Sequence, residues 1–308
     1  MKRFLAALAL VAVVGLLGLK SYDRPPSPPG SWLAVSGLQE RFATVEGLRV
    51  RYVRAGRGPA VFLLHGLASS IYTWKDVIPT LTRGHEVVAL DLPGFGWSDQ
   101  PADLSFDLYP RVVVALMDQL GISRASLVGN SLGGAVGSVV AARHPARVDR
   151  LVLIDAAGFN LRSADRPAMV RLASHPLAEA ILSRLPLKRL LVTLGLRQVF
   201  HDDAKVTEER VTEYLAAVSR PGTLRSLRSL ASSPSLRPEE TEALLRRVIA
   251  PTLVVWGGDE AWIPVAHADR FVAAISGARK VVLPGVGHTP QEEQPGEVVR
   301  LLLEFLVW

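Results

Sequence analysis

Residues 125–134 have the sequence Ala-Ser-Leu-Val-Gly-Asn-Ser-Leu-Gly-Gly, a short apolar run followed at once by a glycine-flanked serine. The run Ala125–Val128 predicts a buried strand, and the stretch Leu132–His144 predicts a helix. Gly-x-Ser-x-Gly at such a strand-to-helix turn lifts the serine hydroxyl clear of the sheet, because glycines permit a turn too tight for side chains. The first amides of the helix and its dipole favour negative charge at the same place. Ser131 is therefore the candidate nucleophile.

Similar apolar runs recur along the chain, separated by helix-length segments such as Phe106–Leu120. This alternation predicts an α/β fold with a mostly parallel sheet and helices on both of its faces. Phe42–Val45 and Leu48–Arg54 flank Glu46-Gly47 and predict an antiparallel hairpin ahead of the parallel strands. The buried strands expected after the hairpin are Ala60–Leu64, Glu86–Leu90, Ala125–Val128, Leu151–Ile154, Thr252–Trp256 and Lys280–Leu283.

The interval between Ile154 and Thr252 has no strand pattern over almost 100 residues. Its apolar residues recur with helical spacing instead, and prolines separate the helical segments. We expect a helical cap at about residues 158–248, inserted in a main domain that spans residues 42–308. The segments with this helical pattern are Pro167–Leu185, Leu187–Val199, Thr207–Ser219 and Glu239–Val248.

A His-Gly turn follows the strand Ala60–Leu64. At this position the backbone amide of Leu67, together with that of Leu132, can point at an oxygen that becomes negative during the reaction. Such an oxyanion hole contributes a factor on the order of 100 or more in turnover for each donor. The His65 side chain is expected to be structural, through hydrogen bonds within its loop.

Two polar residues follow the last two expected strands, at the edge of the sheet where ligands bind in open α/β folds. Asp259 comes after Thr252–Trp256, and His288 comes after Lys280–Leu283. With Ser131 they follow one another in the chain order Ser, Asp, His, each just after an expected strand.

These motifs together resemble the α/β-hydrolase fold family over residues 42–308. The resemblance includes Asp91-Leu-Pro-Gly-Phe-Gly-Trp-Ser-Asp99, Trp256-Gly-Gly-Asp259 with Pro264 behind it, and the stretch Gly287–Pro295. It implies a catalytic triad in which Ser131 is the nucleophile, His288 the general base and Asp259 the residue that orients His288. Asp155, at the end of strand Leu151–Ile154, stands where some relatives place this acid and is the alternative to Asp259. The resemblance also implies that the loop bounded by Asp91 and Asp99 is structural.

The resemblance implies a hydrolase that forms an acyl-enzyme on serine, because relatives that open epoxides or remove halides need a carboxylate nucleophile. Asn130 before the serine is frequent in the meta-cleavage-product branch, which hydrolyses carbon–carbon bonds. That branch usually has a Gly-rich oxyanion loop and a Trp after the catalytic His, where this chain has Leu67–Ser70 and Thr289. The first expectation is hydrolysis of a carboxylic ester, lactone or thioester with a hydrophobic group. Carbon–carbon hydrolysis is the second, and a non-catalytic membrane-tethered binding protein is the remote third.

Composition narrows the classes of site and partner. The 308 residues contain no cysteine, which excludes disulfides, thiolate metal sites and a cysteine nucleophile. Lysine and arginine number 35 against 29 acidic residues, a net charge of +6, but no nucleic-acid motif accompanies this excess. No histidines have metal-ligand spacing. From these features we expect no nucleic-acid partner, no cofactor and no metal, whereas the resemblance and the expected cap imply a small hydrophobic ester-like substrate; the sequence does not indicate an oligomeric state.

The N-terminus has the pattern of an export signal. Lys2 and Arg3 precede an uncharged apolar run, Phe4–Leu19, as in a signal peptide or signal anchor. Residues 1–20 are expected to be that segment and residues 21–41 a Pro-rich linker. The cationic flank predicts a cytoplasmic N-terminus and an exported, membrane-anchored hydrolase domain, or a secreted or periplasmic one if the segment is cleaved.

Overall fold

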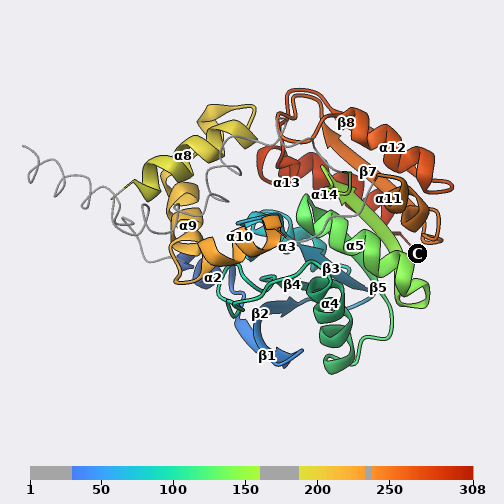
Figure 1. Cartoon of the computed structure of the whole chain (residues 1–308), viewed down its shortest axis with the longest axis horizontal. Helices are drawn as coiled ribbons and strands as arrows, with labels where there is room; N and C mark the ends of the chain where they lie inside the picture. The colour runs from blue at the N-terminus through green and yellow to red at the C-terminus, as the bar shows by residue number, and fades with distance from the viewer. Residues whose placement is uncertain (1–29, 160–186, 233–237, 308) are drawn as a thin grey trace, which may run out of the picture.

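The computed structural model describes residues 30–159, 187–232 and 238–307. Its centre is an eight-stranded sheet with the strand order β1-β2-β4-β3-β5-β6-β7-β8 (Figure 1). β1 and β2 form the predicted hairpin, β2 pairs antiparallel with β4, and the remaining pairs are parallel. The strands are β1 (Glu40–Val45), β2 (Leu48–Ala55), β3 (Ala60–Leu64), β4 (Glu86–Leu90), β5 (Ala125–Asn130), β6 (Val148–Ile154), β7 (Thr252–Gly257) and β8 (Arg279–Leu283).

Helices cover both faces of this sheet, as the alternation of strands and helices predicts. One face packs against α4 (Leu108–Gln119), α5 (Leu132–Arg143), α11 (Pro238–Leu245) and α12 (Ala266–Ala274). The other face packs against η1 (Ile71–Trp74), α3 (Ile78–Leu81) and α14 (Pro295–Phe305). Two short elements complete the main domain: η2 (Pro145–Arg147) and α13 (Pro290–Glu293).

The described part of the interval between β6 and β7 is helical. α8 (Lys188–Val199) contacts α9 (Glu208–Val218), which in turn contacts α10 (Thr223–Ser232), and the short η4 (Asp203–Lys205) lies between the first two. In Figure 1 these helices are drawn in yellow and orange beside the sheet. We refer to α8, η4, α9 and α10 as the cap helices. The expected helix at Pro167–Leu185 lies outside the described residues.

The segment expected to be a linker is packed where it is described. Ser31–Ser36 form a short helix, α2, in which Trp32 and Leu33 are buried. The amide of Gly30 donates to Glu213 of α9 over 2.6 Å. Tight contacts of this kind differ from a solvated spacer, so the folded domain begins at or before residue 30. The expected signal segment, residues 1–20, lies outside the described residues, and within those residues no helix is both long and apolar enough to cross a bilayer.

Candidate active site

Ser131 stands at the turn between β5 and α5 with φ 51° and ψ −114°. A non-glycine residue at positive φ is strained, and such strain is concentrated at functional sites. Backbone contacts hold the turn in place. A Cβ on Gly133 would lie 2.1 Å from the carbonyl oxygen of Leu64, and one on Gly129 would lie 2.3 Å from that of Gly133. The sequence therefore needs glycine on both sides of the serine, as expected from the motif.

The loop after β3 lies against this turn. A Cβ on Gly66 would be 3.2 Å from the Cβ of Ser131, and the next residue but one, Ala68, also has positive φ, 57°. The amides of Leu67 and Leu132 donate no hydrogen bond to another group within the described residues. Both remain available to a substrate oxygen, which is what an oxyanion hole requires.

His65 is structural, as expected, because both of its ring nitrogens are hydrogen-bonded. Nε2 accepts from the amide of Leu92 over 2.9 Å, so Nδ1 has the proton and donates to the carbonyl of Gly66 over 2.7 Å. Burial lowers the pKa of His65, against the opposing charge of Asp91. Asp91 itself accepts from the amides of Ile71 and Trp97 at 2.7 and 2.8 Å. The Asp91 loop is therefore also structural.

His288 is buried, and Nδ1 of its ring is hydrogen-bonded to Oε2 of Glu260, not to Asp259. Oε1 of Glu260 accepts from the backbone amides of Trp262 and Ile263, so the whole carboxylate is fixed. Burial of Glu260 opposes its ionisation, but the charge and hydrogen bond of His288 and these amides outweigh burial and lower its pKa. Glu260 is thus an ionised carboxylate that orients the imidazole.

The predicted role of Asp259 as the partner of His288 is wrong. Its side chain is 47% exposed and accepts from the amide of Gly285 over 2.9 Å. The reason is the backbone: the amides of Gly258 and Asp259 donate to the carbonyls of Leu283 and Val286, which turns the Asp259 side chain outward and Glu260 inward.

Asp155, the alternative acid, lies behind this pair. It ends β6 with φ 42°, is fully buried, and its Oδ1 accepts from the amide of Gly257 over 2.9 Å. One side-chain atom each of Asp155, Glu260 and His288 lie within 4.8 Å of one another. Among the described residues this is the one cluster whose spacing could hold a metal ion. An ion there would have to displace the hydrogen bond between His288 and Glu260.

The cap contacts the loop that contains His288, residues 284–289 between β8 and α13, which we call the histidine loop. The amide of His288 donates to the carbonyl of Val199, at the end of α8, over 2.7 Å. Glu293 accepts from the amide of Gly287 through one oxygen (2.7 Å) and from that of His201 through the other (2.8 Å). On the other side Asn130 donates to the carbonyl of His288 over 3.0 Å. Hydrogen bonds therefore join the histidine loop both to the turn at Ser131 and to the cap.

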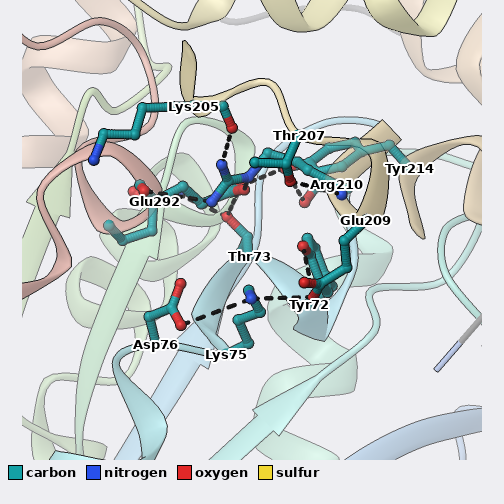
Figure 2. Close-up of polar contacts among 12 residues, drawn as sticks. Tyr72, Thr73, Lys75, Asp76, Lys205, Thr207, Glu209, Arg210, Tyr214 and Glu292 are labelled. Carbon is teal, nitrogen blue, oxygen red and sulfur yellow. Dashed lines mark hydrogen bonds and ion pairs between the residues drawn. The ribbon is translucent and has the colours of Figure 1, made fainter. Parts of the chain in front are cut away.

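A second, buried contact between cap and main domain centres on Glu292 (Figure 2). Its carboxylate accepts from Nε of Arg210 at 2.7 Å, from the Tyr214 hydroxyl at 2.5 Å and from the Thr73 hydroxyl at 2.6 Å. Burial and then the charge of Glu292 raise the pKa of Tyr214, so its phenol stays a donor. This network joins α9 to η1 and to α13. Helix α13 begins at Pro290, shortly after His288. Nothing in the sequence analysis anticipates this network.

Comparisons with known proteins agree with this fold. Residues 59–295 match the family model described as alpha/beta hydrolase fold. The chain belongs to the α/β-hydrolase fold family. It is 32% identical over 271 residues to a 2-hydroxy-6-oxo-6-phenylhexa-2,4-dienoate hydrolase of Comamonas testosteroni, which covers 83% of this chain and 91% of that protein.

Two solved structures of this α/β-hydrolase family are informative neighbours. A membrane phospholipase A, described as a novel bacterial virulence factor, is 27% identical with a TM-score of 0.71, and the match covers 99% of this chain and 98% of that one. A meta-cleavage product hydrolase from Pseudomonas fluorescens is also 27% identical, with a TM-score of 0.73, and the match covers 86% of this chain and 96% of that one.

Proposed function

We propose that this α/β-hydrolase cleaves carboxylic esters that have a hydrophobic group, through an acyl-enzyme on Ser131. The observation that supports this most is the buried hydrogen bond between His288 and Glu260, together with the contact between the His288 carbonyl and Asn130, which precedes the strained Ser131. A carboxylate that holds Nδ1–H of the imidazole leaves Nε2 free to accept a proton from the serine. This arrangement has no use in a scaffold that only binds.

In the proposed reaction Oγ of Ser131 attacks the ester carbonyl as its proton passes to Nε2 of His288. The amides of Leu67 and Leu132 stabilise the oxyanion. When the ester C–O bond breaks, His288 gives this proton to the leaving alcohol. Water, deprotonated by His288, then attacks the acyl-enzyme, and the proton returns to Ser131 as the acid is released.

The preference for a hydrophobic group follows from what surrounds His288. The ring of Trp262 lies 5.5 Å from the imidazole, centroid to centroid. It packs against an apolar cluster of the cap that includes Val199, Phe200 and Val211. An acyl or aromatic group would gain roughly 25 cal/mol for each Å² of apolar surface buried there.

Carbon–carbon hydrolysis is the second candidate, supported by the similarity to the Comamonas dienoate hydrolase. The ester assignment is preferred because the full-length match is to a phospholipase and because Thr289 follows the histidine. A panel of p-nitrophenyl esters of graded chain length, run beside a dienone acid, separates the two. Rates that rise with acyl length support the ester; preferential turnover of the dienone acid would replace it with the second candidate.

The serine mechanism is tested independently of the substrate. A fluorophosphonate probe should label Ser131, as mapped by peptide mass, and Ser131→Ala should abolish labelling while turnover falls by about four to six powers of ten. The far-UV spectrum of this variant should match that of the wild type. An unlabelled wild-type protein would favour the binding-protein hypothesis.

We also propose that residues 4–19 attach the enzyme to a membrane with the hydrolase domain exported. The apolar run and its cationic flank support this, as does the full-length match to a membrane phospholipase. The full chain should sediment with membranes and resist high salt, which screens charge but not apolar insertion. Recovery of a shortened protein in the soluble exported fraction would instead indicate a cleaved signal peptide.

A further inference from the structure

We propose that Asp155 is a positioning residue that shares one proton with Glu260, so that a pair of carboxyl groups, not a single one, supports His288. This inference rests on the proposed function, since it concerns the histidine of that mechanism. It assigns a role to a buried acid at the end of β6, next to but distinct from the acid that bonds the imidazole.

The hydrogen bonds of Asp155 leave one of its two oxygens open to a proton. Oδ1 accepts from the amide of Gly257, whereas Oδ2 is buried and receives no hydrogen bond from any described group. Its acidic neighbour in the cluster is the Glu260 carboxylate. Two ionised carboxylates cannot share a buried site, because the like charges repel, and one proton between them removes this repulsion.

The charges around Asp155 decide which group holds the proton. Glu260 accepts from His288 and from two backbone amides, so its ionised form is favoured. Asp155 accepts a hydrogen bond from a single backbone amide, and the charges of Glu260 and Glu293 both oppose its ionisation. Burial first and the Glu260 charge second hold the pKa of Asp155 well above its usual value. In the proposed arrangement the proton therefore resides on Asp155, whose side chain can then donate a hydrogen bond to the Glu260 carboxylate.

In this arrangement Asp155 can take over the role of Glu260 as the carboxylate that holds His288. Its carboxyl lies within 4.8 Å of a ring nitrogen of His288, so removal of the Glu260 side chain leaves space between them. Without the neighbouring negative charge Asp155 can ionise, accept from Nδ1–H and hold the imidazole in the productive tautomer. The two acids should therefore compensate for each other, and their effects on rate should not be additive.

A double-mutant cycle tests this, with the rate of fluorophosphonate labelling of Ser131 as the readout. Asp155→Asn alone should slow labelling less than about 10-fold, and Glu260→Ala alone about 100-fold. The double variant should lose about 10,000-fold, because no carboxylate then fixes the tautomer. Asp259→Asn in both backgrounds is the matched control and should change the rate little in either.

Outcomes of this cycle distinguish the inference from the function on which it rests. Wild-type protein that is not labelled at Ser131 would overturn the proposed function. Labelled wild type in which Asp155→Asn has the same effect with and without Glu260 would overturn only the shared proton. Urea unfolding of each variant establishes that it is folded, and Asp155→Ser replaces Asn if the latter does not fold.

Discussion

The nucleophile side of the site, residues 64–67 and 129–134, is held by backbone packed on backbone. The histidine side, residues 257–263 and 283–293, has close backbone contacts as well, since a Cβ on Gly257 would lie 2.1 Å from the carbonyl oxygen of Gly287, but its polar side chains also join segments far apart in the chain. Gly133 almost touches the carbonyl of Leu64, whereas His288 depends on the side chain of Glu260. Substitutions of these closely packed glycines should therefore break the fold, and substitutions of the polar side chains on the histidine side should break the chemistry or the docking of the cap.

The largest effect on stability is expected at Gly133. A methyl group there would lie 2.1 Å from the Leu64 carbonyl oxygen, so Gly133→Ala must push a central strand away from α5. We expect a loss of about 4 kcal/mol or more of unfolding free energy, or no folded protein. Gly296→Ala is the control, because a Cβ there meets no atom within 4 Å. Equal stability of the two variants in urea would contradict the close packing of the turn.

The buried ion pair between Arg210 and Glu292 should give the next largest effect. Its side chains are 7% and 3% exposed, so Arg210→Met leaves a buried carboxylate without its cation, at a cost of about 3–5 kcal/mol. Arg197 of α8 forms an ion pair with Asp203 at the surface, and its side chain is 56% exposed. Arg197→Met should therefore cost less than about 1 kcal/mol of unfolding free energy. Thermal unfolding measures both. A small effect at Arg210 would mean that the cap docks without this pair.

A third effect concerns the proton on Asp155 and depends on pH. The folded state, where burial and Glu260 raise the pKa of this acid, holds a proton that the unfolded state releases above about pH 4. Wild-type stability therefore falls as pH rises from that value toward the raised pKa. Asp155→Asn has no such proton, so its stability relative to wild type should increase by at most about 1.4 kcal/mol for each pH unit.

Urea unfolding of both proteins between pH 4 and pH 8 measures this difference, with Asp259→Asn as the control that should show none. A difference between Asp155→Asn and wild type that is constant with pH would mean that Asp155 is ionised in the folded protein. Another group would then have to offset the repulsion between the ionised carboxylates of Asp155 and Glu260.

What the sequence predicts well follows the same division. The sheet, the hairpin and the turn at Ser131 depend on local patterns, and each lies where apolar runs and glycines place it. The choice between Asp259 and Glu260 does not depend on a local pattern. The carbonyls of Leu283 and Val286, some 25 residues later, set the direction of the turn that contains both acids. Two adjacent acids cannot be told apart by residue type.

The cap illustrates a second limit. The Arg210–Glu292 pair is buried although both residues are typical of surfaces, and only the packing of α9 on the main domain brings them together. Helix α10 was not predicted either, since its arginines and serines obscure the apolar period. Its leucines at positions 224, 227 and 230 do have the spacing of one helical face, and this signal was available in the sequence.

The identity of the acid that holds His288 is tested most directly by comparing Glu260→Gln with Asp259→Asn. Because backbone amides fix Oε1 of residue 260, a glutamine would place its carbonyl there and turn its amide group toward Nδ1 of His288. This favours the unproductive tautomer, so kcat/KM on a p-nitrophenyl ester should fall by about 10⁴. Asp259→Asn should stay within about threefold of wild type. An inactive Asp259→Asn beside an active Glu260→Gln would contradict the account.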